Sequence, residues 1–443
     1  MDRSRHGRTA VTPKPGSPGV GVGAQPAQRA RQRAFCIAAL PEGDNLGELR
    51  ELLRTAGVAV VGEMVQHREQ PHPNTYLGPG KVTEAKAAAQ ACDANVIACD
   101  DELSPRQERN LEAALGIPVV DRTTVILDIF AAHASSAEGK LQVELAQLEY
   151  NLARMRGLWT HLERLGGGIG TRGPGETQIE TDRRLARDRI AALRRRLDHV
   201  RSTRGVMRAE RERAALPSIA LAGYTNAGKS TLLNALTGSE VGVRDRLFHT
   251  LDPSTRMLRL SGRPYLITDT VGFIRKLPHQ VVDAFGATLE ETRRADLLVH
   301  VLDASAPEAE VTLMRRAVEE VLEEIGAGDT PLLLVLNKVD LLDESQRAEL
   351  RQQHPKAVLL SADTGAGLDE LGERIEREFR RTLQPVDLLV PYANGGNLAE
   401  LHELVGTLER RDTPEGVRVR ALVPARLAER FARFAVKLEP LAK

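Results

Sequence analysis

The feature that most constrains the fold is a glycine-rich segment, Gly223 to Ser230, with the sequence G-x-x-x-x-G-K-S. A short apolar stretch, residues 218–222, precedes it, and a helical pattern, residues 231–236, follows it. A strand, this kind of loop and a helix together form a phosphate-binding unit, because backbone N–H groups at the helix N-terminus and one lysine surround the phosphates. The segment therefore predicts an α/β domain that binds a nucleotide.

A second motif, Asp269-Thr-Val-Gly272, follows the apolar stretch 266–268. We expect Asp269 to anchor Mg²⁺ through water, beside the Ser230 hydroxyl, and the Gly272 N–H to sense the γ-phosphate. Lys229 supplies a point charge to the β- and γ-phosphates.

A third motif, Asn337-Lys338-Val-Asp340, follows the buried-type strand 332–336. A carboxylate at Asp340 can accept from both N1–H and the 2-amino group of guanine, whereas adenine would leave it unpaired, which is a strong basis for discrimination. Ser361 and Ala362 complete the base pocket through backbone N–H groups. The spacing of the three motifs is typical of one GTPase domain.

These motifs predict one site for GTP or GDP and Mg²⁺. The residues predicted to bind nucleotide are Gly223, Tyr224, Thr225, Asn226, Ala227, Gly228, Lys229, Ser230, Thr231, Asp269, Gly272, Asn337, Lys338, Asp340, Ser361 and Ala362. The residues predicted to hold the metal are Ser230, Thr250 and Asp269, and those predicted to act in hydrolysis are Lys229, Thr250 and Gly272.

The switch threonine has two candidates. Thr250 lies in the stretch between the phosphate-loop helix and Asp269, where a hydroxyl on Mg²⁺ is expected. Thr255 also has an acceptable spacing. We favour Thr250 and keep Thr255 as the alternative.

The residue after Gly272 is Phe273. Ras-like enzymes place a glutamine there to orient the attacking water, and a phenylalanine cannot do so. Either Phe273 only packs the switch, or unassisted hydrolysis is slow and a partner must order the site; both can hold. Asn226 raises a separate hypothesis, that its amide oxygen helps to coordinate K⁺ near the phosphates; capping of the loop is the structural alternative.

The chain of 443 residues is too long for one core, and its patterns divide it into five parts. Short apolar runs alternate with helical patterns from Phe35, which argues for a small parallel α/β domain. Leucines spaced by four and three residues then predict an antiparallel helical hairpin with a glycine-rich tip. The predicted parts are a disordered basic tail (1–34), an N-terminal α/β domain (35–135), the hairpin (136–213), the GTPase domain (214–383) and a small C-terminal α/β domain (384–443).

Charge is balanced overall, with 61 basic and 61 acidic residues, but it is segregated. Residues 1–34 carry seven Lys and Arg against one Asp, and residues 183–213 carry twelve Arg against four acids. Such segments attract polyanions. Only 3% of residues are aromatic, which favours recognition of RNA phosphates over base stacking. The predicted RNA contacts are Gly168, Gly170, Arg172, Gly173, Arg194, Arg195 and Arg196; the alternative is a solvated helix face.

The sequence disfavours two other classes of protein and two other kinds of nucleotide site. No apolar run approaches the ~20 residues that span a bilayer. Three cysteines are too few for a disulfide framework and indicate a reducing compartment. The spacing Gly168-x-Gly170-x-x-Gly173 matches a dinucleotide fingerprint, but it follows a helix and not a strand. The run Gly78-Pro-Gly-Lys81 is too short for a second phosphate loop that would bind ATP.

The segments 166–178, 74–81, 223–230 and 248–253 together resemble the HflX family of bacterial translational GTPases. The resemblance covers roughly residues 35–443, and the glycine-rich segment is its most specific part. It implies an N-terminal α/β domain, a helical hairpin, a Ras-like domain and a small C-terminal domain. Phe273 agrees with the family's hydrophobic substitution, whereas the arginine-rich tail departs from its pattern.

The resemblance also implies binding to the large ribosomal subunit and its RNA, and splitting of stalled or idle ribosomes. We accordingly expect a monomer in the cytoplasm, partly associated with ribosomes. The alternative is a nucleotide-gated RNA-binding or ribosome-assembly module in which no splitting occurs.

Overall fold

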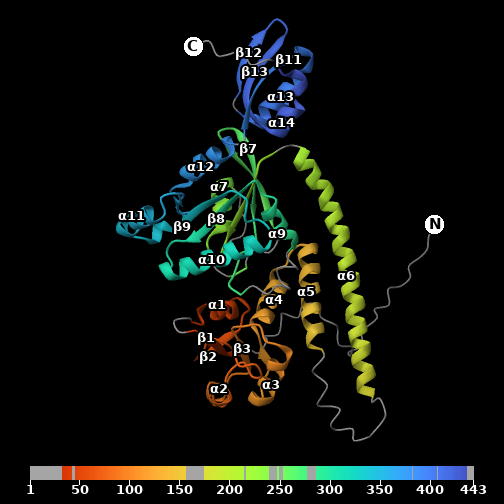
Figure 1. Ribbon diagram of the computed structural model, residues 1–443, viewed down its shortest axis with the longest axis vertical. Helices are drawn as coiled ribbons and strands as arrows, with labels where there is room; N and C mark the ends of the chain where they lie inside the picture. The colour runs from red at the N-terminus through yellow and green to blue at the C-terminus, as the bar shows by residue number, and fades with distance from the viewer. Residues whose placement is uncertain are drawn as a thin grey trace, which may run out of the picture.

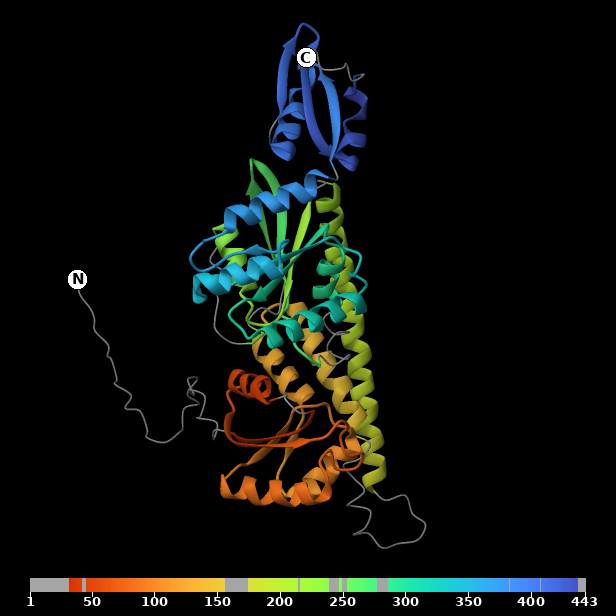
Figure 2. The ribbon, with the colours of Figure 1, turned by 60° about the vertical axis from the view of Figure 1, so that its left-hand side comes forward.

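The computed structural model describes residues 32–41, 45–155, 174–213, 216–238, 247–248, 253–276, 286–381, 383–406 and 408–436. Three bodies follow one another along the long axis of the molecule (Figure 1). The N-terminal sheet lies at one end, the sheet that carries the phosphate loop lies in the middle, and a small antiparallel sheet lies at the other end. Figure 2 shows that the long helix α6 runs beside the first two bodies.

The N-terminal domain is built on a four-stranded sheet in the order β2-β1-β3-β4, with every pair of neighbours parallel. Strand–helix alternation predicts a parallel sheet of this kind. Ser104 caps α3 in a capping box with Gln107, and Pro105 occupies the first helical position. The elements are β1 (Arg33–Leu40), α1 (Gly47–Thr55), β2 (Ala59–His67), α2 (Pro79–Ala91), β3 (Val96–Cys99), α3 (Pro105–Leu115) and β4 (Val119–Val120).

Three helices follow the N-terminal sheet: α4 (Arg122–His133), α5 (Ala137–Arg154) and α6 (Pro174–Arg213). Leu141, near the start of α5, packs with Leu193 and Leu197, which lie well along α6. The chain therefore reverses between the two helices, as the leucine spacing predicts. The other face of α5 is buried against the N-terminal domain through Val143, Ala146 and Tyr150.

The central sheet has six strands in the order β10-β9-β8-β5-β7-β6, and only the edge strand β6 runs antiparallel to its neighbour. Its apolar strands are buried on both faces, as parallel strands covered by helices must be. The elements are β5 (Ser218–Gly223), α7 (Lys229–Thr237), β6 (Ser254–Leu260), β7 (Arg263–Asp269), α9 (Gly286–Arg293), β8 (Leu297–Asp303), α10 (Glu308–Glu324), β9 (Leu332–Asn337), α11 (Glu344–Gln353), β10 (Val358–Leu359) and α12 (Leu368–Arg380).

The C-terminal domain is a three-stranded antiparallel sheet in the order β11-β13-β12, with a core of its own. Arg263 at the start of β7 donates to the carbonyl oxygens of Val405 and Leu422, at 3.2 and 2.8 Å, and thereby joins this domain to the central sheet. Its elements follow the chain order strand, helix, strand, strand and helix. The elements are β11 (Leu383–Val390), α13 (Gly395–Val405), β12 (Glu409–Thr413), β13 (Gly416–Pro424) and α14 (Ala425–Arg430).

Among the described residues, no helix is both long and apolar enough to cross a membrane. Residues 1–31 of the predicted tail and residues 156–173, which include most of the glycine-rich tip, lie outside the described residues. Two predicted bounds are wrong: Arg33, inside the predicted tail, already begins β1, and Pro174, inside the glycine-rich segment, already begins α6, since proline is well suited to the first turn of a helix.

Candidate nucleotide-binding site

The phosphate loop connects the end of β5 to the start of α7, at the carboxyl edge of the central sheet. Gly228 has a φ of 91°, and a Cβ atom there would lie 2.2 Å from Nδ2 of Asn337, so only glycine fits this position. The first N–H groups of α7 have no partner within the helix. Together with the positive end of the helix dipole, they form the anion site that the sequence predicts.

Lys229 is buried at the first position of α7. Its Nζ donates to the carbonyl oxygens of Gly223 and Tyr224, at 3.0 and 2.9 Å. Burial lowers the pKa of Lys229 to about 8, and the nearby carboxylate of Asp269 acts in the opposite direction. An ammonium group that is desolvated in this way gains strongly from a phosphate, because the anion replaces the lost hydration.

Ser230 and Asp269 lie together, as the sequence predicts for a shared metal. The hydroxyl of Ser230 donates to Oδ2 of Asp269 over 2.6 Å, and Asp269 is fully buried at the end of β7. A hydroxyl and a carboxylate are hard oxygen donors of the kind that Mg²⁺ prefers. The described residues contain no group of three or more His, Cys, Asp or Glu side chains that could hold a metal. A cation here would therefore complete its coordination with phosphate and water oxygens.

Gly272 and Phe273 lie directly against the phosphate loop. Phe273 donates its N–H to the carbonyl oxygen of Gly223 (3.1 Å) and accepts from the N–H of Thr225 (2.8 Å). Its side chain is fully buried. A Cβ atom on Gly272 would lie 2.9 Å from Cα of Thr225 and 3.2 Å from Nζ of Lys229. The segment that should sense the γ-phosphate is thus in contact with the loop and the lysine.

The base motif joins the loop through Asn337, which is 2% exposed. Its Nδ2 donates to the carbonyl oxygen of Ala227 (2.9 Å), and its Oδ1 accepts from the N–H of Ala362 (3.0 Å). Asn337 therefore fastens the phosphate loop to the residues predicted to border the base.

Asp340 is exposed in the turn that follows β9, whereas Ser361 is fully buried. Lys338, at a φ of 65°, pairs with Asp303 over 2.7 Å. The third motif thus leaves one carboxylate accessible to a ligand.

Several predicted residues lie outside the described residues: Thr250, Gly168, Gly170, Arg172 and Gly173. Thr255, the alternative switch threonine, lies in β6 paired with Thr268, and their hydroxyl oxygens are 2.9 Å apart. A hydroxyl held between two paired strands is a poor metal ligand, so Thr250 stays the preferred prediction.

Asn226, a predicted site residue, and Lys81, from the run that the sequence analysis disfavours, have defined surroundings. Asn226 has a φ of 62°, a left-handed conformation that asparagine tolerates better than most residues. Lys81, in the run considered for ATP, pairs with Glu84 at the start of α2. Neither arrangement requires a ligand.

The predicted RNA-binding arginines lie on exposed positions of α6. Arg194 pairs with Glu149 of α5 over 2.7 Å, and Arg189 pairs with Glu144 over 2.6 Å. Arg194 thus has a partner within the hairpin, which leaves Arg195 and Arg196 as the better candidates for RNA.

The sequence analysis missed that the N-terminal domain reaches the nucleotide site. The hydroxyl of Tyr224 in the phosphate loop donates to Glu48 of α1. Arg275, three residues after Gly272, also pairs with Glu48, and Arg122 of α4 is buried beside them. No motif marks Glu48 or Arg122, because their roles depend on packing between domains.

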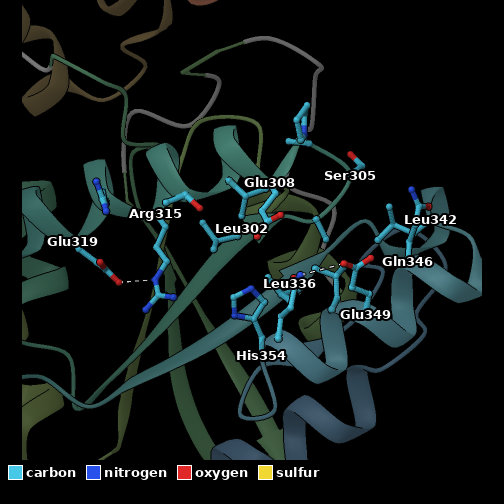
Figure 3. A pocket seen from close by; sticks show the side chains of 18 residues that line it. Leu302, Ser305, Glu308, Arg315, Glu319, Leu336, Leu342, Gln346, Glu349 and His354 are labelled. Carbon is cyan, nitrogen blue, oxygen red and sulfur yellow. Dashed lines mark hydrogen bonds and ion pairs between the residues drawn. The ribbon is translucent and has the colours of Figure 1, made fainter. Parts of the chain in front are cut away.

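A surface pocket of about 520 Å³ lies between α10 and α11 (Figure 3). Leu302 and Leu336 line it, and Arg315 and Glu319 form an ion pair at one side. None of its lining residues belongs to the three nucleotide motifs. The pocket is therefore separate from the candidate site.

Comparison with known proteins identifies three regions of the chain. A family model described as "GTP-binding GTPase N-terminal" matches residues 43–131, and "GTP-binding GTPase Middle Region" matches residues 133–211. A model described as "50S ribosome-binding GTPase" matches residues 218–338. These ranges correspond to the N-terminal domain, the helical hairpin and the central sheet.

Curated relatives match over most of the chain. GTPase HflX of Caldanaerobacter subterraneus is 45% identical over 92% of this chain and 95% of the relative. GTPase HflX of Escherichia coli is 45% identical over 82% of this chain and 85% of the relative. Among solved structures, a GTP-binding protein from Sulfolobus solfataricus in complex with GDP is 26% identical, with a TM-score of 0.40, over 78% of this chain and 98% of that chain.

Proposed function

The chain belongs to the HflX family of GTPases, and from this we propose that it binds the large ribosomal subunit and uses GTP to split stalled or idle ribosomes. That it is a GTPase with a guanine nucleotide site follows from the family and from the phosphate-loop domain. The large subunit as partner, the splitting of ribosomes and the role of each residue are the proposal.

One observation carries the proposal: the helix that bears the exposed arginines is followed in the chain by the strand that ends in the phosphate loop. The hairpin helix α6 leads directly into β5, and β5 leads into the phosphate loop. Exposed Arg195 and Arg196 lie on the same helix. A change at the nucleotide can therefore alter how the hairpin meets an RNA surface.

The residues of the site have distinct roles in this proposal. Lys229 binds the β- and γ-phosphates, and the N–H of Gly272 donates to the γ-phosphate. Ser230 and Asp269, joined by Thr250, would hold Mg²⁺, which neutralises charge that develops on the phosphate oxygens. Asp340 selects guanine, and Asn337 holds the base pocket against the loop.

Unassisted hydrolysis is slow in this proposal because position 273 lies in the core and presents no side chain to the attacking water. The side chain of Phe273 is fully buried, so it packs the switch and leaves no polar group to orient water. A partner that orders the site or supplies polar groups would then accelerate hydrolysis by positioning and electrostatic stabilisation. This links turnover to the presence of the ribosome.

Potassium is a second element of the proposal. Asn226 lies in the phosphate loop, where its amide oxygen could coordinate a monovalent cation in addition to capping the loop. Turnover in K⁺ that exceeds turnover in Na⁺ would support the cation role, and equal turnover would leave only the structural one.

RNA contact through the hairpin can be tested by salt dependence. Replacing Arg195 and Arg196 with Gln should weaken ribosome binding and reduce the slope of log affinity against log salt by about one per arginine. Arg377→Gln, an exposed arginine on α12, is the matched control. An unchanged slope in the double variant would contradict RNA contact at these positions.

Ribosome profiles separate splitting from the alternative of an RNA-binding or assembly module. Intact ribosomes are incubated with the protein and GTP, a non-hydrolysable GTP analogue or GDP, and the subunits are then resolved on a gradient. Splitting with GTP and with the analogue, but repeated turnover only with GTP, supports the proposal. Binding without any rise in free subunits would favour the assembly module.

A further inference from the structure

The turn that follows β8 lies beside the base motif. Asp303, the last residue of β8, is directly opposite Asn337, the last residue of β9, in the parallel pairing of the two strands. The backbone N–H of Ala304 donates to the carbonyl oxygen of Asn337 over 2.9 Å. The two turns that leave these strands are therefore fixed to each other at the point where the base motif begins.

The carboxylate of Asp303 joins these turns a second time through side chains. Its Oδ2 accepts from Nζ of Lys338 over 2.7 Å. Its Oδ1 accepts from the N–H and the hydroxyl of Ser305, at 2.9 and 2.5 Å. The side chains of Lys338 and Asp303 are 27% and 20% exposed, so water screens their ion pair less than it screens a fully exposed one. The pair therefore restrains the ammonium group of Lys338.

Without this restraint the ammonium group could reach Asp340. Lys338 has a φ of 65° and is followed by a short 3-10 turn, Val339–Leu341. The Cα atoms of residues two positions apart are separated by at most ~7 Å, and the four methylene groups of a lysine side chain can span that distance. In the described part of the chain, Asp340 is exposed and its carboxylate has no hydrogen-bond or ion-pair partner. An unrestrained ammonium group nearby would be attracted to it.

A pair between Lys338 and Asp340 would compete with the nucleotide. In the proposed function, the carboxylate of Asp340 accepts from the N1–H and 2-amino groups of guanine. A carboxylate that already accepts from an ammonium group must be released before it can bind the base, and this release lowers the affinity. Guanine recognition thus gains from an ammonium group that is held elsewhere.

We propose that Asp303 is a positioning residue for guanine selectivity: by holding Nζ of Lys338, it keeps the carboxylate of Asp340 available to the base. The proposal rests on the role of Asp340 in the proposed function and does not depend on any action at the ribosome.

The variant Asp303→Asn tests this role. Its amide oxygen can still accept from Ser305, but its NH₂ group cannot accept from Lys338. Calorimetry measures the dissociation constants of the full-length protein for GDP and for inosine diphosphate, whose base lacks the 2-amino group. The affinity for GDP should fall about tenfold, equivalent to ~1.4 kcal/mol. The affinity for inosine diphosphate should fall only about threefold, because its base donates one hydrogen bond to the carboxylate instead of two.

A second background separates positioning from general damage. Lys338→Met keeps an apolar side chain of similar length but has no ammonium group. In this background, adding Asp303→Asn should change either affinity by no more than about twofold, because the competing group is absent. Glu319→Gln is the matched control, since it breaks a pair with Arg315 over 2.8 Å in the same domain, on α10. Its affinities for both nucleotides should equal those of the wild type.

An unchanged affinity for GDP in folded Asp303→Asn would overturn the proposal, and so would an equal loss with Lys338 and with methionine at that position. Equal losses for GDP and inosine diphosphate would also overturn it, because they indicate damage that does not depend on the base. If Asp303→Asn does not fold, Asp303→Ser, which also lacks the carboxylate, is measured instead.

Asp340→Asn is measured in parallel. A large loss of GDP affinity in Asp340→Asn, with none in Asp303→Asn, would overturn the role of Asp303 and leave guanine selection by Asp340 intact. A GDP affinity in Asp340→Asn close to that of the wild type would overturn both.

Discussion

Asn337→Ala tests whether the base motif and the phosphate loop are one structural unit. The side chain of Asn337 is 2% exposed and forms two hydrogen bonds, to the carbonyl oxygen of Ala227 and from the N–H of Ala362. Alanine removes both bonds and leaves two buried backbone groups without a partner. Both neighbours are themselves buried, so water cannot readily replace the lost amide.

The expected loss follows from these two bonds. Each neutral hydrogen bond contributes roughly 1 kcal/mol, and each partner left unsatisfied in the interior costs ~1–3 kcal/mol before relaxation. With partial relaxation of the loop, we expect the free energy of unfolding of the central domain to fall by about 2–4 kcal/mol. At ~1.4 kcal/mol per tenfold change, this is a large effect.

Urea unfolding followed by circular dichroism measures the loss. The chain has several domains, so the transition of the central domain is identified as the one that saturating GDP shifts to higher urea. Asn110→Ala is the matched control, because Asn110 forms one side-chain hydrogen bond, to Asn74, within the N-terminal domain. A loss below about 0.5 kcal/mol in the GDP-sensitive transition of Asn337→Ala would refute the reasoning.

Three further predictions concern the site. Because burial lowers the pKa of Lys229 to about 8 and a phosphate must raise it, GDP binding should take up a proton, and the uptake should be larger at pH 9 than at pH 7.5. Calorimetry in buffers of different ionisation enthalpy measures this uptake; Lys229→Arg should abolish it, and equal uptake at both pH values would contradict the assignment. Phe273→Gln should leave unassisted turnover within about twofold and destabilise the protein by ~3 kcal/mol, because the side chain is fully buried; a tenfold faster turnover at unchanged stability would contradict this. Asp340→Asn should weaken GDP binding by about a hundredfold or more and favour xanthine, whose C2 carbonyl accepts from the new amide; a GDP affinity within threefold of the wild type would exclude Asp340 as the guanine acceptor.

Much of the fold could be predicted because its determinants are local. A serine at position 104 followed by a proline is typical of a helix start, and α3 begins at Pro105 with Ser104 as its N-cap. The leucine spacing of the hairpin places Leu141 and Leu193 in one seam, where they pack. Helix α4 was not predicted, because most of its residues are buried. Its own sequence therefore shows no amphipathic pattern.

The nucleotide site also contains residues that local motifs predict and residues that they do not. The phosphate loop, Asp269 and Asn337 belong to motifs that are continuous in sequence, and the parallel sheet brings their ends together at one edge. Glu48 and Arg122 could not be found in this way. They act through contacts with residues far along the chain, and a buried arginine has no sequence pattern that distinguishes it from a surface one.

Sedimentation with separated ribosomal subunits tests the proposed function most directly. The protein is mixed with large or small subunits at two salt concentrations, with the GTP analogue or with GDP. We predict that it sediments with the large subunit in the presence of the analogue, less so at the higher salt, and that GDP releases it. Undiminished attachment with GDP, or equal attachment to both subunits, would contradict the account.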